Sequence, residues 1–385
     1  MKCEIKKREE PKMIVMDVRL DNFMAFKNFH INMSYPKKIL NSYIDEEFLK
    51  DRPNFRYKKV NILMGANASG KTSFGKMLMN IFNFMDKREV ERITELICDV
   101  SKKAKFSIDF ITNDEYSLYR VVVEIAPKTE EKYKNSDISV SVNKVMINVK
   151  DSYESCSKRL DEMGVLVENN ITEELEKIKG LSWLFEYPTD SQFVYDFPKE
   201  NFDGYLTVLE NTLKALDPSI IKVEKILNVK NTFVVRMKYQ DVIIQDGKII
   251  KSDVLSSGTK AGIAIANMVA SIINGDNGFY YCDEKFSYIH TDIEKAFLTL
   301  MIQCLKSNDQ LFFTTHNTDI LELQLPKHSF TFLRKDLDDE NEPIKCVSAS
   351  EFLKRNTDSL KNAVENDLFS TAPSTELIYQ LELLK

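Results

Sequence analysis

The sequence lacks the features that mark secreted, metal-stabilised and membrane proteins. Its six cysteines include no C-x-x-C pair and have no regular spacing, so neither a zinc site nor a disulfide framework is predicted. The first residues contain no apolar h-region of a signal peptide. No apolar run approaches the length of about 18 residues that a membrane span needs. These absences predict a cytoplasmic protein with no membrane partner.

The chain also lacks an excess of positive charge. Lys and Arg number 53 against 59 Asp and Glu, a net charge of −6, which argues against non-specific coating of nucleic acid, although a local basic patch stays open. No internal repeat occurs, and no heptad pattern persists long enough for a coiled-coil arm. With 385 residues, 43% hydrophobic and 29% charged, the chain can form two lobes, or one large domain with an insertion.

The most informative segment is a glycine-rich motif between a predicted strand and a predicted helix. Residues 65–72 read GANASGKT after the apolar run Val60–Met64, which matches G-x-x-x-x-G-K-[ST]. Such a loop aims backbone N–H groups at phosphate oxygens, and the helix start adds partial positive charge. Lys71 is expected to reach the β- and γ-phosphates, and the Thr72 hydroxyl to bind Mg²⁺. The predicted phosphate-binding residues are Gly65, Asn67, Ser69, Gly70, Lys71, Thr72 and Ser73.

Two later apolar strands end in polar residues suited to phosphate chemistry. The first, Phe279–Cys282, leads into Asp283 and Glu284. An acid at a strand end can hold Mg²⁺, which is the role expected of Asp283, and Glu284 can orient the attacking water or accept its proton. The second strand ends at His316, which is predicted to donate a hydrogen bond to the γ-phosphate.

A second anion-binding position is predicted at the start of another helix. Residues 255–260 read LSSGTK, and small residues at a helix start leave backbone N–H groups exposed. Ser256, Ser257 and Gly258 are the candidates. An ordinary serine N-cap explains this segment equally well when it is viewed alone.

Taken in order, these motifs resemble the Walker A, signature, Walker B, D-loop and H-loop of an ABC-type ATPase head, with residues 289–292 (IHTD) as the D-loop. Residues 18–29 (VRLDNFMAFKNF) are similar to the N-terminal strand of the SMC/RecF branch. Within that branch the sequence most resembles the OLD-like prokaryotic ATPases, many of which stand beside a nuclease in phage-defence operons. The resemblance covers roughly residues 13–126 and 232–335.

This resemblance implies an α/β P-loop NTPase fold of the ABC/SMC-head type. A mostly parallel central sheet is expected, with an antiparallel β subdomain and a mixed, largely helical insertion. The expected segments are the first half of the core (13–126), the insertion (127–231), the second half of the core (232–345) and a helical tail (346–385).

The resemblance also implies hydrolysis of ATP with Mg²⁺. Glu284, His316 and Lys71 would be catalytic, and Thr72 and Asp283 would hold the metal. Ser256, Ser257 and Gly258 would act in trans, in a homodimer or higher even oligomer.

Several residues depart from the family pattern. The signature reads SSGTK rather than the SGGQ of transporters, which favours the SMC-like branch. No glutamine precedes Gln192, so a Q-loop glutamine is not identifiable, and Lys285 stands where a proline is usual after the Asp-Glu pair.

Three functions are compatible with these motifs. The favoured one is an ATP-gated switch or sensor for a separate effector, a nuclease or toxin of phage defence, because the chain shows no Toprim-like acidic cluster of its own. The alternatives are a RecF-like repair ATPase that clamps DNA and a nucleotide-binding subunit of a transporter.

Overall fold

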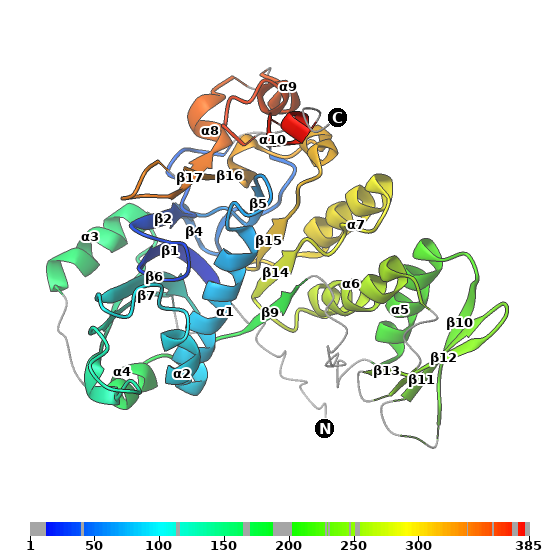
Figure 1. The fold of residues 1–385 in the computed structure, drawn as a ribbon, viewed down its shortest axis with the longest axis horizontal. Helices are drawn as coiled ribbons and strands as arrows, with labels where there is room; N and C mark the ends of the chain where they lie inside the picture. Colours follow the sequence, from blue (N-terminus) through cyan, green and yellow to red (C-terminus); the bar gives the residue numbers. More distant parts are fainter. Residues whose placement is uncertain are drawn as a thin grey trace, which may run out of the picture. The chain divides into compact units, whose positions relative to one another are not determined.

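The computed structural model describes most of the chain in two compact units (Figure 1). Unit 1 comprises Met1–Ile14, Ile111–Tyr116 and Lys179–Phe312, and unit 2 comprises Val15–Phe110, Ser117–Ile178 and Phe313–Lys385. The described residues are 13–39, 42–112, 116–164, 170–187, 202–227, 229, 232–245, 248–250, 255–336, 338–355, 358–371 and 376–381.

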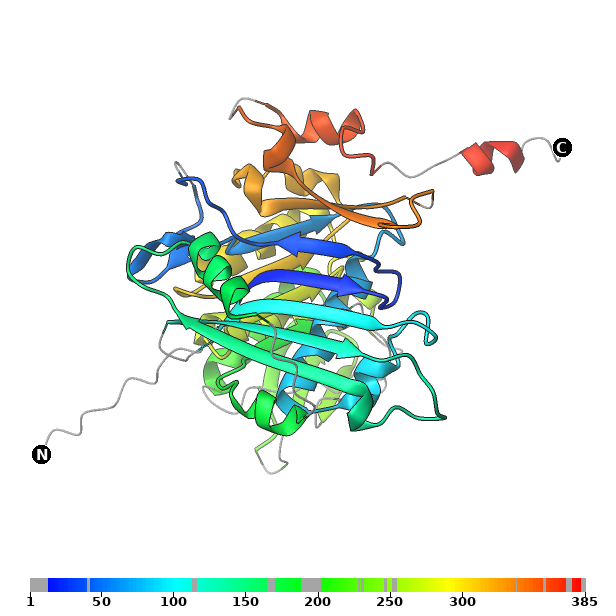
Figure 2. The ribbon, with the colours of Figure 1, turned by 90° about the vertical axis from the view of Figure 1, so that its left-hand side faces the viewer.

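Unit 2 is built on a five-stranded sheet with the order β2-β1-β6-β7-β8 (Figure 2). Strands β1 and β2 pair antiparallel, as do β7 and β8. Apolar side chains alternate with polar ones along these strands, as expected for a sheet whose two faces differ in environment. The strands are β1 (Ile14–Asp21), β2 (Phe29–Asn32), β6 (Ala104–Ile111), β7 (Ser117–Ile125) and β8 (Ile138–Met146).

Helix α1 (Lys71–Lys87) packs against the apolar face of this sheet. The ring of Phe84 lies 6.1 Å from that of Phe106 in β6, and the ring of Phe74 lies 5.7 Å from that of Phe29 in β2. The opposite face is partly covered by α3 (Tyr153–Met163). Helix α4 (Ile171–Glu176) lies at the edge of the sheet, where Glu174 Oε2 accepts from Val142 N of β8 (2.8 Å). The helix that follows the P-loop is therefore part of the core of unit 2.

Unit 2 also contains the strand that precedes the P-loop. Strand β5 (Val60–Met64) is fully buried and pairs in parallel with β16 (Phe330–Lys335), which pairs antiparallel with β17 (Ile344–Ser348). The remaining elements are β3 (Phe48–Leu49), β4 (Arg52–Arg56), α2 (Val90–Thr94), η1 (Asn135–Asp137), η3 (Thr318–Glu322), η4 (Lys327–Ser329), α8 (Ala349–Phe352), α9 (Leu360–Glu365) and α10 (Glu376–Gln380).

Unit 1 combines a buried parallel strand pair with a small antiparallel sheet. Strand β14 (Phe279–Asp283) pairs in parallel with β9 (Trp183–Glu186), and Gln310 N, at the start of β15 (Gln310–Thr314), donates to Gly278 O (2.8 Å). The boundary between the two units falls inside β15, after Phe312. The sheet β10-β11-β12-β13 is antiparallel throughout. Its strands are β10 (Ile220–Lys225), β11 (Thr232–Met237), β12 (Asp241–Gln245) and β13 (Lys248–Ile250).

Three helices complete unit 1: α5 (Phe202–Leu216), α6 (Ser257–Asn274) and α7 (Thr291–Cys304). Helices α5 and α6 approach closely at Gly262, where an added Cβ would lie only 2.5 Å from Leu216 Cδ1. A continuous core of Leu209, Phe233 and Ile263 joins these helices to the antiparallel sheet.

One expectation from the sequence meets a different arrangement in the structure. Residues 127–231, expected to form one inserted subdomain, contribute to both units: β8 extends the sheet of unit 2, whereas β9, α5 and β10 lie in unit 1. The pairs β5–β16 and β9–β14 are parallel, and the pair β16–β17 is antiparallel. Among the described helices, none has the length and apolarity required to cross a bilayer.

Candidate nucleotide-binding site

The loop after β5 has a backbone that only glycine fits comfortably at two positions. Gly65 has φ +152°, and a Cβ there would lie 2.3 Å from Leu333 O and 2.6 Å from Ser69 Oγ. Gly70 has φ +107°, and its Cβ would lie 3.0 Å from Ile344 Cδ1. Both values lie in the region that side-chain-bearing residues avoid. The two glycines of the motif therefore let the backbone form a tight concave turn at the start of α1.

Polar groups line this turn. The Lys71 side chain is buried, and its Nζ donates to Gly65 O (2.9 Å) and Ala66 O (3.2 Å). Ser69 Oγ is buried and has no hydrogen-bond partner among the described residues. An orphaned buried hydroxyl costs free energy unless a ligand or water satisfies it. Because no side chain caps the start of α1, its first N–H groups also point into the turn.

The remaining residues of the motif are accessible to a ligand. Asn67 is exposed, and Thr72 and Ser73, in the first turn of α1, are partly exposed. A helix of 17 residues carries about half a positive charge at this end. The turn is therefore suited to a polyphosphate, and a Cβ at Gly65 would close it.

His316 lies in unit 2 as well, beside the strand that leads into the loop. Thr315 N donates to Leu63 O (3.2 Å), which holds the residues after β15 next to β5. His316 is exposed directly after this contact. The structure therefore places His316 on a segment that neighbours the strand before the P-loop, and its role toward the terminal phosphate stays a prediction.

In unit 1, β14 ends at the two predicted acids. Asp283 is fully buried and is the last residue of β14. Glu284 is partly exposed and has φ +41°, a left-handed value that is rare for a residue with a side chain and costs about 1–3 kcal/mol. Its carbonyl accepts hydrogen bonds from Ser287 N (3.2 Å) and Ser287 Oγ (2.8 Å), which close a turn after the strand.

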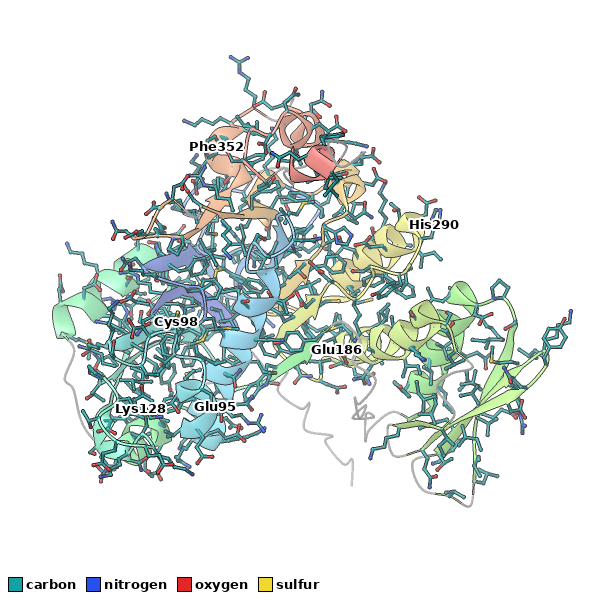
Figure 3. All side chains as sticks on the ribbon, in the orientation of Figure 1. Glu95, Cys98, Lys128, Glu186, His290 and Phe352 are labelled. Atoms are coloured by element: carbon teal, nitrogen blue, oxygen red, sulfur yellow. The ribbon has the colours of Figure 1, made fainter. Side chains whose placement is uncertain are left out.

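The predicted signature and D-loop contact each other within unit 1. Ser256 caps α6, its Oγ accepting from Thr259 N (3.0 Å), so the capping interpretation holds for this serine. Ser256 and Ser257 are nonetheless exposed. A Cβ on Gly258 would lie 3.2 Å from Tyr288 O, just before the D-loop. His290, which caps α7 through its Nδ1, is exposed at the start of that helix (Figure 3).

The candidate residues thus form two groups, one in each unit. Gly65–Ser73 and His316 lie in unit 2, and Asp283, Glu284 and the signature residues lie in unit 1. Gln192, the first glutamine of the chain, lies outside the described residues. No cluster of three or more His, Cys, Asp or Glu side chains suited to a metal occurs in the described part of the chain.

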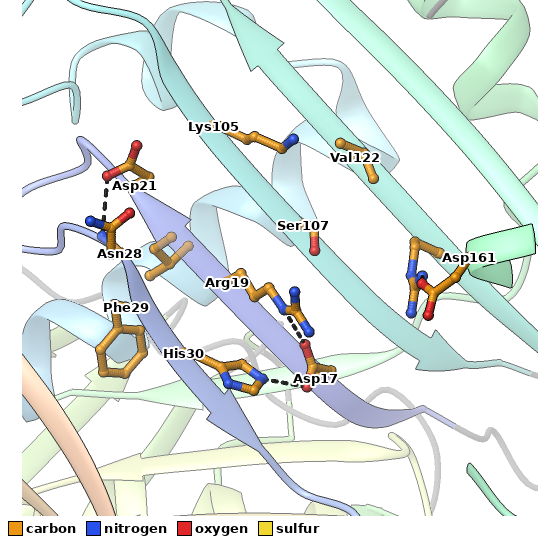
Figure 4. A pocket seen from close by; sticks show the side chains of 12 residues that line it. Asp17, Arg19, Asp21, Asn28, Phe29, His30, Lys105, Ser107, Val122 and Asp161 are labelled. Carbon is orange, nitrogen blue, oxygen red and sulfur yellow. Dashed lines mark hydrogen bonds and ion pairs between the residues drawn. The ribbon is translucent and has the colours of Figure 1, made fainter. Parts of the chain in front are cut away.

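A polar pocket of about 530 Å³ occupies the outer face of the five-stranded sheet (Figure 4). Its central carboxylate, Asp17, is nearly buried and accepts from Arg19 Nε (3.2 Å) and Asn32 Nδ2 (2.9 Å), with His30 Nε2 at 2.7 Å. Arg120 in β7 pairs with Asp109 in the adjacent strand β6 (2.7 Å). Asp17 and Arg120 therefore each have an oppositely charged partner.

Comparisons with known proteins give a fold and no close relative. No protein-family model and no curated protein matches the sequence. Among solved structures, the chain is similar to an SMC head bound to the C-winged helix domain of ScpA, with 16% identity and a TM-score of 0.51 over 88% of this chain and 99% of that one.

Two further structures align over similar lengths. An SMC head with an extended coiled coil from Pyrococcus furiosus gives 14% identity and a TM-score of 0.49, over 89% of this chain and 98% of that one. The recombination mediator RecF gives 10% identity and a TM-score of 0.42, over 88% and 99%. The first match, with the higher TM-score, shows that the chain has an SMC-head-like α/β fold.

Proposed function

We propose that this chain is an ATPase of the ABC/SMC type, which binds ATP with Mg²⁺ and hydrolyses it to ADP and phosphate. The observation that supports this most strongly is the turn between β5 and α1. Gly65 and Gly70 open it, Lys71 lines it, and the buried Ser69 hydroxyl has no partner among the described residues. These are the features of a triphosphate cradle.

In this proposal the predicted residues have separate roles in ATP hydrolysis. Thr72 and Asp283 would hold the Mg²⁺, which neutralises charge on the β- and γ-phosphates. Lys71 stabilises the charge that develops as the terminal phosphoryl group transfers, and His316 donates a hydrogen bond to it. Glu284 orients the attacking water and accepts its proton as the water oxygen bonds to the γ-phosphorus and the bond from that phosphorus to the ADP oxygen breaks.

The signature residues complete the site of a second copy. Ser256, Ser257 and Gly258 stand at the start of an 18-residue helix, and the two serines are exposed. The backbone N–H groups there suit an anion presented by another protomer. The functional unit is then a homodimer, or a higher even oligomer, that closes when ATP is bound and opens after hydrolysis.

Closure and opening of the dimer would act as a switch for a separate effector. The resemblance to OLD-like ATPases makes a nuclease or toxin of phage defence, acting in the cytoplasm, the leading candidate. The alternative, a RecF-like ATPase that clamps DNA, predicts hydrolysis that DNA stimulates and that salt suppresses.

The ATPase proposal is tested by hydrolysis and association measured on the same samples. Wild type should hydrolyse ATP only with Mg²⁺. Glu284→Gln should retain ATP and form a dimer in light scattering, because ATP closes the dimer and this variant cannot hydrolyse it. Lys71→Ala should remain a monomer with ATP present. A wild type that neither retains nor hydrolyses ATP would refute the proposal.

The effector is tested on the complex from the native host. The tagged full chain is isolated with its bound partners, and nuclease activity is measured with ATP, with ADP and in the Glu284→Gln background. Nuclease activity that changes with the nucleotide supports the switch. Stimulation of the purified ATPase by DNA alone, reduced by salt, would instead support the DNA clamp.

A further inference from the structure

The turn that carries Glu284 is held by a residue that sequence patterns give no reason to expect. Lys285 follows Glu284 directly, yet its side chain is only 3% exposed. A lysine ammonium is almost never buried unless it is paired. Its Nζ lies 3.5 Å from Glu186 Oε2 and donates to the carbonyl of Tyr187. Lys285 therefore points inward from the turn toward the end of β9.

Glu186 is the last residue of β9 and lies opposite Cys282 in the parallel pairing of β9 with β14. Its side chain is 10% exposed, and Asn267 Nδ2 in α6 donates to its Oε1 (3.3 Å). Burial raises the pKa of Glu186, and the Lys285 ammonium and the Asn267 amide oppose that rise. The carboxylate is thus held between two strands and a helix, all in unit 1 (Figure 3).

These contacts support a strained backbone. Glu284 adopts φ +41°, and such a conformation persists only when its surroundings over-determine it. Ser287 holds the turn from one side through the Glu284 carbonyl, and Lys285 holds it from the other through Glu186. Asn267 adds α6, whose first turn carries Ser257 and Gly258. The turn with the acid and the signature helix are therefore tied to the same buried carboxylate.

We propose that Glu186 and Lys285 form a positioning pair that fixes the Glu284 carboxylate for hydrolysis. This inference rests on the proposed ATPase function and deepens it. Neither member needs to touch the nucleotide. Because Lys285 is bonded to Glu284, release of its ammonium would free the turn to relax toward an ordinary backbone conformation. The Glu284 carboxylate would then move, and a displacement of about 1 Å costs about 10²-fold in rate.

The experiment compares three variants with wild type: Lys285→Met, Glu186→Gln and the double variant, all close in shape to the original side chains. For each, kcat, the dissociation constant for Mg·ATP and the melting temperature are measured. Each single variant leaves one buried charge unpaired, so its melting temperature should fall. We expect kcat to fall about 10- to 100-fold and the dissociation constant to change by less than about twofold, because phosphate binding depends on the P-loop.

The double variant separates positioning from folding. It removes both buried charges, so its melting temperature should recover toward wild type, whereas its kcat should stay low because the link to β9 is gone. Recovery of kcat together with the melting temperature would overturn the inference, since only folding would then be involved. This comparison keeps its force even if one single variant folds poorly.

A buried ion pair in unit 2 provides the matched control. Arg120 and Asp109 lie 2.7 Å apart with side chains 16% and 2% exposed. Arg120→Met should lower the melting temperature and leave kcat unchanged. If wild type and this control hydrolyse ATP, Glu284→Gln does not, and Lys285→Met retains the wild-type kcat, then the positioning role is wrong and the ATPase proposal stands. A wild type that does not hydrolyse ATP would refute both the positioning role and the ATPase proposal.

Discussion

The turn after β5 and the turn after β14 both have a left-handed backbone, but different residues adopt it. Each follows a fully buried strand and requires a left-handed backbone. The first turn, in unit 2, places glycines at Gly65 and Gly70. The second, in unit 1, places Glu284 there, at φ +41°. Gly65 and Gly70 have no Cβ to oppose such a backbone, and Ala68 between them is left-handed as well, at φ +62°. The turn at Glu284 contains no glycine and is held by contacts of Ser287 and Lys285.

This difference shows what determines the backbone conformation of each loop. The P-loop can be recognised from eight consecutive residues because its conformation is local. The turn at Glu284 is held by Lys285, whose contact with Tyr187 joins residues 98 positions apart. Rigidity at a reacting group therefore comes from tertiary contacts that no short motif contains.

The largest effect should come from adding one carbon to the glycine turn. Gly65→Ala places a Cβ 2.3 Å from the Leu333 carbonyl oxygen, which is backbone and cannot move aside. We expect a loss of more than about 3 kcal/mol of stability and no measurable ATP binding. Calorimetric melting and nucleotide titration measure both.

The control for this change is Gly164→Ala. Gly164 also has a left-handed φ, +70°, but a Cβ there meets nothing within 4 Å. Only the backbone preference of alanine opposes this φ, so the free energy of unfolding should fall by about 1 kcal/mol. If the two alanine variants were equally stable, the clash at Leu333 would have no part in shaping the turn.

The next effect in size tests the glutamate turn. Glu284→Gln keeps the shape of the side chain and removes its ability to accept a proton. Hydrolysis should fall about 10²- to 10⁴-fold while ATP binding persists. A steady-state assay measures the hydrolysis rate, and an equilibrium titration measures ATP binding. A wild-type rate in this variant would contradict the assignment of Glu284.

A smaller effect is expected where the signature meets the segment before the D-loop. A Cβ on Gly258 would lie 3.2 Å from Tyr288 O, so the two segments must separate by a few tenths of an ångström. Gly258→Ala should cost about 1 kcal/mol and weaken ATP-dependent dimerisation, with little change in ATP binding by the monomer. Sedimentation with ATP measures the dimer, and an unchanged dimer would show that this contact is not at the interface.

The smallest effect concerns thiol reactivity and leaves activity untouched. Burial raises the pKa of Cys156 in unit 2 to about 11 and also raises that of Cys282 in β14 of unit 1. Because the thiolate is the reactive form, both should resist alkylation at pH 8, and labelling of Cys156 should increase as the pH approaches 11. The exposed Cys98 should react first. Peptide mass spectrometry follows each cysteine, and fast labelling of Cys282 at pH 8 would show that β14 opens.

The sequence predicts the local parts of this molecule and misses the long-range ones. The P-loop, the strand into Asp283 and the helix after Ser256 follow from motifs and apolar periodicity. Glu186 was not identified, although Trp183–Tyr187 is a short run of apolar side chains interrupted by one acid, between Gly180 and Pro188. Its role depends on the parallel pairing of β9 with β14, which a single sequence does not specify.

The sequence also does not show which parts of residues 127–231 belong to each unit. Residues 138–146 pair along their whole length with β7, and that pairing determines where they belong. Lys285 was recognised only as a departure from the usual proline. Its importance emerges from the buried contact with Glu186.

The central claim is that the turn between β5 and α1 binds a triphosphate through Lys71. Calorimetric titration of the full chain with Mg·ATP tests it most directly, with Lys71→Ala as the comparison. Wild type should bind saturably, and the variant should lose binding while it melts at the wild-type temperature. Equal affinity in the two proteins, or no heat of binding in wild type, would contradict the account.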